Sequence, residues 1–237
     1  MRSAQISLAE HRQIAMLRRK IGPARVLLPR TEAIIFDIDG VLADSRQAVV
    51  KNTHRLLLQS GRRVGMEVVE RAAKKGCSAR TILLEAAPSL AQNEEELAHM
   101  VNMLAKLSVE NVGSIKPTVL SGLVPALARE YALAIASNRL PSAAHAILER
   151  LGIAAFFEAV MTIGDAPPKP APDMIRLALV RLEVPAASAV FVGDKPSDRR
   201  AGEAAGVRTI MVDACRGTDG CLGFIREFGK EGVKQWK

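Results

Sequence analysis

Two aspartates one residue apart, Asp37 and Asp39, follow a short apolar run at residues 33–36. Such a run is typical of a buried strand in a parallel sheet. Side chains alternate along a strand, so both carboxylates would point to the same side and could act on one bound group. In open α/β sheets, ligands bind at the carboxyl ends of strands. The pair therefore indicates a cation-binding or catalytic strand end, although Gly40 also fits an ordinary polar turn.

Polar side chains also follow two later apolar runs and occupy one proline-rich turn. The candidates are Ser137 and Asn138 after residues 133–136, Lys169 in the turn PPKPAPD, and Asp194 and Asp198 after residues 189–192. Each alone has an ordinary explanation as a helix cap, a solvated loop charge or an acid at a helix N-terminus. If all of them meet at one edge of a sheet, they combine carboxylates, a hydroxyl and an ammonium group. That combination suits Mg²⁺ together with a phosphate group.

The elements that must position these residues alternate along the chain. Strand patterns occur at residues 33–36, 133–136, 160–163, 189–192 and 209–212, and helical patterns at 123–130, 141–151, 172–182 and 197–205. Alternating strands and helices predict right-handed crossovers and a mostly parallel sheet covered on both faces. We therefore expect an α/β fold with a Rossmann-like parallel core.

One connection is much longer than a crossover requires. The first two strand patterns are separated by far more than the dozen or so residues that a crossover needs. Helical patterns fill this interval, at residues 48–60, 67–75, 78–87 and 94–112. We expect a small all-helical cap inserted after the first strand, where a lid could exclude water from the strand ends.

The expected organisation has four parts. They are a basic N-terminal extension at 1–30 with one helix, an α/β core at 31–45 and 117–214, a helical cap at 46–116 and a C-terminal tail at 215–237. In the extension, Ser7 and Glu10 have capping-box spacing ahead of an apolar stripe, which favours a docked helix. Because the extension is basic and amphipathic, a transit peptide is the competing interpretation.

Composition narrows the class of protein. The 237 residues are 49% hydrophobic and 24% charged, which is typical of a soluble globular protein. The net charge of +8 lies entirely in residues 1–30 and 215–237, and aromatic residues make up only 3% of the chain. With few aromatic rings for base stacking, nucleic acid is not an expected partner.

The sequence also bears on the compartment. No apolar stretch reaches the roughly 20 residues that span a bilayer. The three cysteines lack the spacing of metal ligands, which favours the reducing cytoplasm.

The ordered motifs resemble those of the haloacid dehalogenase superfamily, in the class with a helical cap after the first strand. The matching residues are DIDGVL at 37–42, Ser137, Lys169, and GDKPSD at 193–198. The resemblance covers about residues 32–212. Within the superfamily, the chain is similar to the branch of phosphoglycolate phosphatases and β-phosphoglucomutases.

This resemblance implies roles for the site residues. Asp37 would be the nucleophile that forms an aspartyl-phosphate, and Asp39 would protonate the leaving group and then activate water. Ser137, Asn138 and Lys169 would bind the phosphoryl oxygens. The implied ligands of Mg²⁺ are Asp37, the backbone carbonyl of Asp39, and Asp194, with Asp198 supporting them.

The expected function is a Mg²⁺-dependent phosphatase for a small phosphorylated metabolite. Relatives that cleave carbon–halogen bonds lack the second aspartate, so Asp39 favours phosphoryl chemistry. A sugar-phosphate mutase of the β-phosphoglucomutase kind is the alternative, and a non-catalytic phosphate-binding or nucleic-acid-associated protein is the third hypothesis. In the cap, Lys75 and Arg80 are candidate substrate contacts, with solvated helix-start charges as the alternative. Lys195, where the family commonly has a small hydroxyl residue, is expected to point outward.

Overall fold

A five-stranded parallel sheet forms the centre of the molecule in the computed structural model, which describes residues 31–75 and 78–232. The strands are β1 (Ala33–Phe36), β4 (Ala132–Ala136), β5 (Ala159–Met161), β6 (Ala189–Gly193) and β7 (Arg208–Met211). Their order in the sheet is β5-β4-β1-β6-β7, and every neighbouring pair is parallel. The expected α/β fold with a parallel core is confirmed. The helix expected within residues 1–30 lies outside the described residues.

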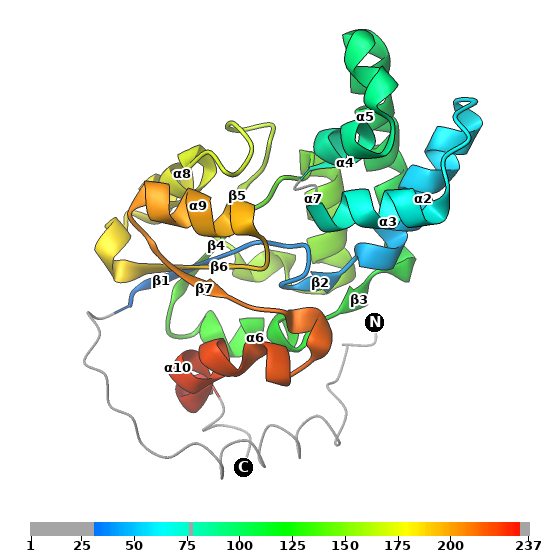
Figure 1. The fold of residues 1–237 in the computed structure, drawn as a ribbon. Helices are drawn as coiled ribbons and strands as arrows, with labels where there is room; N and C mark the ends of the chain where they lie inside the picture. Colours follow the sequence, from blue (N-terminus) through cyan, green and yellow to red (C-terminus); the bar gives the residue numbers. More distant parts are fainter. Residues whose placement is uncertain (1–30, 76–77, 233–237) are drawn as a thin grey trace.

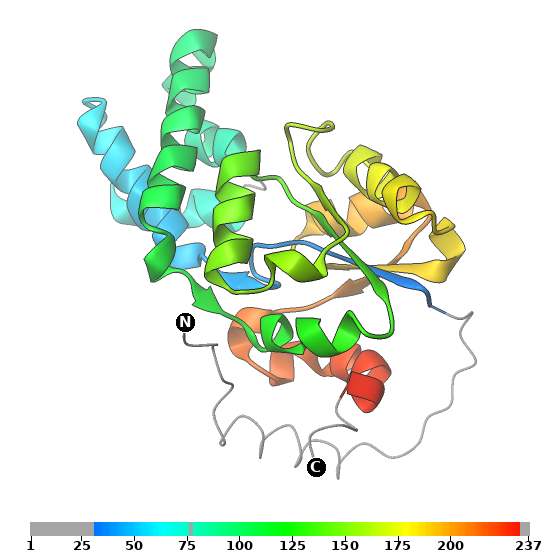
Figure 2. The same cartoon turned by 180° about the vertical axis from the view of Figure 1, so that it is seen from behind.

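Helices cover both faces of this sheet (Figures 1 and 2). One face carries α8 (Asp173–Leu182) and α9 (Pro196–Ala205), and the other carries α6 (Val119–Leu127), α7 (Pro141–Arg150) and α10 (Leu222–Gly232). The alternation of side chains along β1 explains this division, because Ile34 and Phe36 pack on the second face while Ala33 and Ile35 pack on the first.

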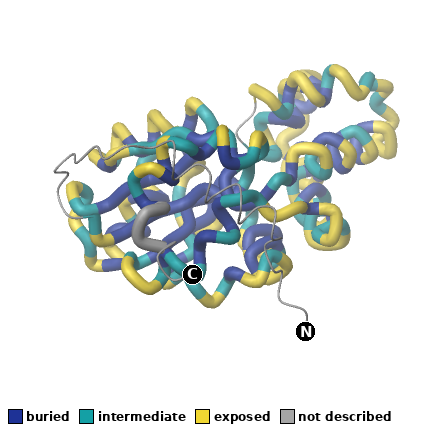
Figure 3. Tube along the Cα trace, turned by 90° about the horizontal axis from the view of Figure 1, so that it is seen from below, coloured by how far each residue is buried: buried dark blue, intermediate teal, exposed yellow. Residues whose placement is uncertain are grey.

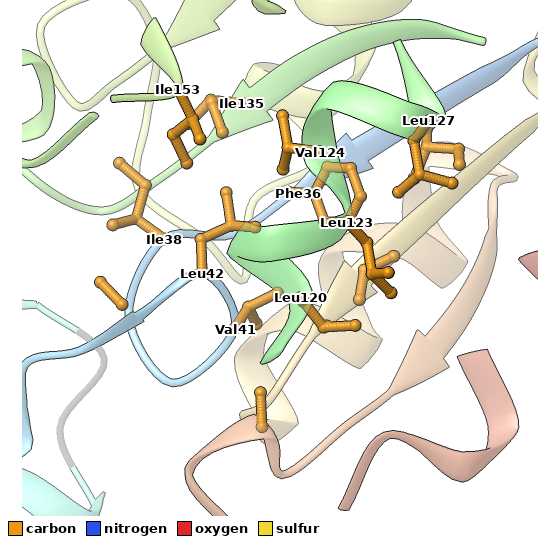
Figure 4. Packing of buried hydrophobic residues seen from close by; sticks show 14 of the residues in the cluster. Phe36, Ile38, Val41, Leu42, Leu120, Leu123, Val124, Leu127, Ile135 and Ile153 are labelled. Atoms are coloured by element: carbon orange, nitrogen blue, oxygen red, sulfur yellow. The ribbon is translucent and has the colours of Figure 1, made fainter. Parts of the chain in front are cut away.

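Phe36, the last residue of β1, is fully buried beneath α6, where Leu123, Val124 and Leu127 surround it (Figure 4). Its ring also packs edge-on against that of Phe224 in α10, with the ring centroids 5.8 Å apart. Full burial of one such side chain stabilises the fold by about 1.5–3 kcal/mol. The end of the strand that leads into the aspartate pair is therefore held against α6 and α10 on this face of the sheet.

A separate group of helices follows β1 in the chain and lies beyond the strand ends, as a lobe at one side of the molecule (Figures 1 and 3). It consists of α2 (Arg46–Gln59), α3 (Met66–Lys75), α4 (Ala79–Ala86) and α5 (Glu94–Glu110). These helices bury a hydrophobic cluster of their own, which includes Leu57, Leu83 and Leu97. We call residues 46–110 the helical segment.

Local sequence explains where these helices begin. Ser78 forms a capping box with Thr81 at the start of α4, and the Asn93 side chain accepts a hydrogen bond from the Glu96 backbone at the start of α5. Three glutamates in the first turn of α5 interact favourably with the positive end of its dipole. An antiparallel pair, β2 (Ala43–Asp44) and β3 (Lys116–Pro117), joins the helical segment to the core.

The C-terminal segment, which the sequence analysis treated as a tail, forms α10 against the core. Phe224 and Phe228 are buried in the same cluster as Phe36, and the Phe228 ring packs edge-on against Tyr131 at 5.5 Å between centroids. The short 3₁₀ helices of the chain are η1 (Pro88–Gln92), η2 (Val112–Ser114), η3 (Ala154–Phe156), η4 (Ala186–Ser188), η5 (Ala214–Arg216) and η6 (Asp219–Cys221). Within the described part of the chain, no helix has the length and apolar character needed to cross a membrane.

Candidate active site

Asp37 lies directly after β1 and is almost fully buried at 5% exposure. Its backbone N–H donates to the carbonyl of Val192 at 2.9 Å, so the hydrogen bonds of the sheet continue up to this residue. The chain then turns through Gly40. Its φ of +77° lies in the left-handed region of the backbone, which glycine adopts more readily than other residues do. A Cβ atom on Gly40 would lie only 2.1 Å from Oδ2 of Asp194. The absence of a side chain at residue 40 therefore allows Asp194 to approach the strand end.

Three carboxylates meet at this position. One oxygen each from Asp37, Asp194 and Asp198 lies within 4.8 Å of the others. Lys169 is buried beside them, and its Nζ lies 2.9 Å from Oδ1 of Asp37 and 2.7 Å from Oδ1 of Asp198. The amine therefore offsets part of the negative charge, because it is shared between the nucleophile candidate and a neighbouring acid.

The protonation equilibria of this cluster show that the carboxylates need more positive charge than Lys169 supplies. Burial raises the pKa of Asp37, although Lys169 opposes this, and the carboxylate of Asp198 raises it further. Burial and the nearby Asp37 raise the pKa of Asp194 to about 8. Burial lowers the pKa of Lys169, but Asp198 and Asp37 outweigh burial and the net shift is upward.

The donor set fits a hard divalent cation. Carboxylate oxygens are preferred ligands of Mg²⁺ and Ca²⁺. Oδ1 of Asp194 is buried and makes no hydrogen bond to any part of the chain that the structure describes. A buried carboxylate oxygen without a partner costs free energy unless an ion or water binds it. Asp37 and Asp194 are therefore the side chains whose oxygens could hold a metal.

Asp198 supports this cluster from the first turn of α9. Its Oδ2 accepts hydrogen bonds from the backbone N–H groups of Asp194 at 3.1 Å and Lys195 at 2.9 Å. A Cβ atom on Gly193 would lie 2.3 Å from Cβ of Asp198, so glycine is required where β6 leaves the sheet. With Oδ1 bound to Lys169, both carboxylate oxygens of Asp198 are already engaged by the protein.

Ser137 follows β4 at the same edge of the sheet and has no exposed surface. Its backbone N–H donates to the carbonyl of Met161 at 2.9 Å, which fixes its position. Its Oγ is buried and without a hydrogen-bond partner among the described residues. A phosphoryl oxygen would satisfy this hydroxyl, since a hydroxyl donates one hydrogen bond.

Asn138, an expected phosphate ligand, lines the pocket at this edge of the sheet and hydrogen-bonds to the backbone of Lys169. Its Nδ2 donates to the backbone carbonyl of Lys169 at 3.0 Å, and its Oδ1 accepts from the backbone N–H of Lys169 at 2.7 Å. The side chain of Asn138 thus holds the loop that presents Lys169. These two bonds occupy the amide, so any contact of this side chain with phosphate would be additional to them.

Asp39 contacts an arginine that the sequence analysis did not identify. Arg139 binds it with two hydrogen bonds, Nε to Oδ2 at 2.7 Å and Nη2 to Oδ1 at 2.6 Å, and the Ser45 hydroxyl also donates to Oδ1. Burial raises the pKa of Asp39, but Arg139 outweighs burial and lowers this pKa to about 2. The position of Arg139 directly after the Ser137–Asn138 pair was the available signal in the sequence.

A pocket lies between the helical segment and this edge of the sheet. The core contributes Asp39, Arg139, Asp194 and Lys195 to its wall, and the helical segment contributes mainly apolar side chains such as Val49, Ile82 and Leu104. The expectation that Lys195 points outward was wrong. Lys195 lines the pocket and lies close enough to Asp39 and Asp194 to lower the pKa of each carboxyl.

The two basic candidates in the helical segment lie away from this pocket. Arg80 pairs with Glu94 at 2.5 Å, and Lys75 lies 3.7 Å from Glu85, with all four side chains largely exposed. Neither basic residue is among the described residues of the pocket wall. The structure does not bring Lys75 or Arg80 to the acidic cluster.

Comparison with known proteins places this arrangement in a family. The family model of haloacid dehalogenase-like hydrolases matches residues 34–212. A phosphoglycolate phosphatase of Cupriavidus necator is 30% identical over 203 residues, which cover 80% of this chain and 83% of the relative. The pyrophosphatase PpaX of Bacillus velezensis is 28% identical over 192 residues, covering 77% and 83% of the two chains.

A solved structure shares the fold at low sequence identity. The β-phosphoglucomutase of Clostridium difficile superimposes with a TM-score of 0.65 at 20% identity, over 80% of this chain and 88% of that one. Apart from Ala33 at the start of β1, the family match spans the strands of the parallel sheet, and it includes every residue of the acidic cluster. The chain therefore belongs to the haloacid dehalogenase-like hydrolases.

Proposed function

We propose that this protein is a Mg²⁺-dependent phosphatase that hydrolyses a small phosphorylated metabolite through an aspartyl-phosphate intermediate. The observation that carries the proposal is the buried Asp37 carboxylate, which lies 2.9 Å from the Lys169 amine and within 4.8 Å of Asp194 and Asp198. A carboxylate in contact with a fixed cation and a candidate metal site is suited to attack a phosphate ester. The names of the curated relatives, a phosphatase and a pyrophosphatase, support this class of reaction.

In the first step, an oxygen of Asp37 attacks phosphorus and the ester oxygen leaves with a proton from Asp39, which must first separate from Arg139, because that contact lowers the pKa of Asp39 to about 2. In the second step, Asp39 accepts a proton from water, which attacks the same phosphorus and releases phosphate and free Asp37. Lys169 and the Ser137 hydroxyl would stabilise charge on the phosphoryl oxygens in both steps. Mg²⁺ held by Asp37, Asp194 and the backbone carbonyl of Asp39 would supply further positive charge to those oxygens.

The remaining parts of the chain have proposed roles in the same reaction. Residues 46–116 act as a cap that encloses the substrate against the core at 31–45 and 117–214, and the pocket between them supports this assignment. Enclosure would exclude bulk water while the phosphoryl group is transferred to Asp37, before the water of the second step attacks. We propose the cytoplasm as the compartment, where small phosphorylated metabolites are available.

Release of inorganic phosphate from p-nitrophenyl phosphate tests the proposal. We expect release that requires Mg²⁺ and is abolished in Asp37→Asn, because an amide is a poor nucleophile. Asp173→Asn is the matched control, since Asp173 is exposed at the start of α8, away from the pocket wall that the structure describes. Folded wild-type protein that releases no phosphate with Mg²⁺ would overturn the proposal. Interconversion of sugar phosphates with little net phosphate release would support the mutase instead.

A further inference from the structure

The contact between Asp39 and Arg139 leaves the proposed proton donor fully engaged. Both oxygens of Asp39 accept hydrogen bonds from the guanidinium, and Oδ1 also accepts one from Ser45. For Asp39 to reach the oxygen of a leaving group, at least one of these bonds must break. Bidentate arginine–carboxylate pairs are among the stronger polar contacts in proteins. Some feature of the substrate must therefore compensate for the bond that is lost.

Arg139 itself sets the condition for this exchange. Its side chain is only 10% exposed, and Asp39 is the carboxylate that pairs with it. Removing the partner of a buried charge is strongly unfavourable, because the remaining charge is neither hydrated nor paired. Release of Asp39 is thus favourable only when another anion takes its place on Arg139.

The pocket shows where that anion would come from. Arg139 and Asp39 both line it, on the core side, while the helical segment opposite presents mainly apolar side chains such as Val49, Ile82 and Leu104. The part of the substrate that leaves must extend from the phosphorus into this space. A negative group on that part would meet Arg139 as it enters the pocket.

We propose that Arg139 is the specificity-determining residue of this site: it binds a carboxylate or second phosphoryl group on the leaving portion of the substrate, and in doing so releases Asp39. This inference rests on the proposed phosphatase function. It predicts a preference for substrates that carry a second anionic group over substrates of equal size that do not. It also gives Arg139 one role in binding and a second role in positioning Asp39.

A pair of substrates that differ in one group tests this preference. The probes are 2-phosphoglycolate, which carries a carboxylate, and 2-hydroxyethyl phosphate, which carries a neutral hydroxyl at the same place. A charge-assisted bidentate contact should give the wild-type protein a kcat/KM roughly 10- to 100-fold higher for 2-phosphoglycolate. Inorganic pyrophosphate is the third probe, and it separates preference for a second phosphoryl group from preference for a carboxylate.

Arg139→Met should change the kcat/KM values for the two substrates in opposite directions. We expect kcat/KM to fall for 2-phosphoglycolate, because its carboxylate loses its partner, and to rise for 2-hydroxyethyl phosphate, because Asp39 is no longer bound. Arg139→Lys keeps the charge but not the fork of donors and should retain part of the preference. Arg150→Met is the matched control, because Arg150 is an exposed arginine in the last turn of α7, outside the pocket wall that the structure describes, and its loss should leave the ratio between substrates unchanged.

The outcomes separate this inference from the proposed function. If Arg139→Met lowers kcat/KM by the same factor for both substrates, Arg139 has a general structural role and the inference is overturned. If the wild-type protein hydrolyses 2-hydroxyethyl phosphate with the same kcat/KM as both anionic probes, the inference is overturned without any variant. This outcome does not depend on whether Arg139→Met folds. Failure of the wild-type protein to release phosphate from every probe with Mg²⁺ would instead overturn the proposed function.

Discussion

At the scale of single residues, the site consists of acids whose charge is only partly offset by the cations around them. Lys169 contacts both Asp37 and Asp198, and Arg139 contacts Asp39. Asp194 has no comparable cation in direct contact among the described residues, and its Oδ1 is the buried carboxylate oxygen left without a partner. Asp194 is therefore the acid of this site whose negative charge the protein offsets least, and it is also a candidate metal ligand.

This imbalance predicts a pH dependence of stability. The pKa of Asp194 rises from 3.8 to about 8 in the folded protein without metal, so the folded state binds more protons than the unfolded state between these values. The resulting stabilisation is present below about pH 4 and is lost as the pH rises toward 8. Thermal unfolding in EDTA at several pH values should show Tm falling over this window from the contribution of this group.

With Mg²⁺ bound, stability should rise with pH instead of falling. Mg²⁺ requires the deprotonated carboxylate, so its apparent affinity should rise as the pH approaches 8. Titration of Mg²⁺ at pH 6 and pH 8, followed by Tm, measures this directly. Equal midpoints at both pH values would contradict the assignment of Asp194 as a ligand. Asp194→Asn should reduce this pH dependence, because an amide does not titrate, and should leave the part that comes from Asp37, whose pKa is raised to about 6.

A second prediction at this scale concerns Gly40. Gly40→Ala places a Cβ atom 2.1 Å from Oδ2 of Asp194 and also strains a backbone whose φ is +77°. We expect the Mg²⁺ concentration for half-maximal phosphatase activity to rise roughly 10-fold or more, as with other changes that displace a metal ligand.

Gly152→Ala controls for backbone strain alone. Gly152 also has a positive φ, at +70°, but a Cβ atom there would meet no atom within 4 Å. It should lose about 1–2 kcal/mol of stability from strain, with an unchanged Mg²⁺ requirement. If both alanine variants shift the Mg²⁺ requirement equally, steric displacement of Asp194 is not the cause.

At the scale of elements, most of the fold follows from apolar periodicity. The expected strand at 33–36 coincides with β1, and the other four expected strands overlap β4, β5, β6 and β7. The central strands β1, β4 and β6 are buried on both faces of the sheet, so packing agrees with their intrinsic preference for strand. The helical patterns within 46–116 correspond in the same way to α2, α3, α4 and α5.

The elements that the sequence analysis did not assign depend on contacts between distant residues. The pair β2 and β3 has two residues in each strand, which is too short for any period to be recognised. Phe224 and Phe228 in α10 do have helical spacing, and this was a usable signal. The apolar surface that holds α10 comes from residues such as Phe36 and Tyr131, far earlier in the chain.

The packing of α10 predicts that it stabilises the core. Phe228→Ala removes a ring that is 2% exposed and stacks 4.9 Å from Phe224, so we expect a loss of about 3–5 kcal/mol of unfolding free energy. Denaturant unfolding measures this loss. Val180→Ala, at a side chain that is 70% exposed on α8, should change the free energy of unfolding by no more than about 0.5 kcal/mol. Equal stability of Phe228→Ala and wild type would mean that α10 does not support the core.

At the scale of the whole molecule, segments that are far apart in the sequence meet at one edge of the sheet. Asp37 follows β1, Ser137 follows β4, Asp194 follows β6, and Lys169 comes from the loop before α8. The sequence predicts this meeting, because parallel strands have a common carboxyl edge. It does not predict which partners form. Asp39 and Arg139 are 100 residues apart, and local pattern carries no information about such a pair.

The helical segment completes the site at this scale, because it forms the wall opposite the acidic cluster. The basic residues that sequence favoured there, Lys75 and Arg80, pair with glutamates of the same segment instead. Surface charge pairs of this kind depend on which helices lie side by side. The positive charge in the pocket comes largely from the core, through Arg139 and Lys195, with Arg46 at the start of α2.

The central claim is that Asp37 carries the phosphoryl group during turnover. The most direct measurement is mass spectrometry of protein quenched in acid during steady-state hydrolysis of p-nitrophenyl phosphate with Mg²⁺. We expect one added phosphoryl group on the peptide that contains Asp37, absent from Asp37→Asn and absent when Mg²⁺ is removed. Phosphate release that continues in Asp37→Asn, with no phosphorylated peptide in the wild-type protein, would contradict it.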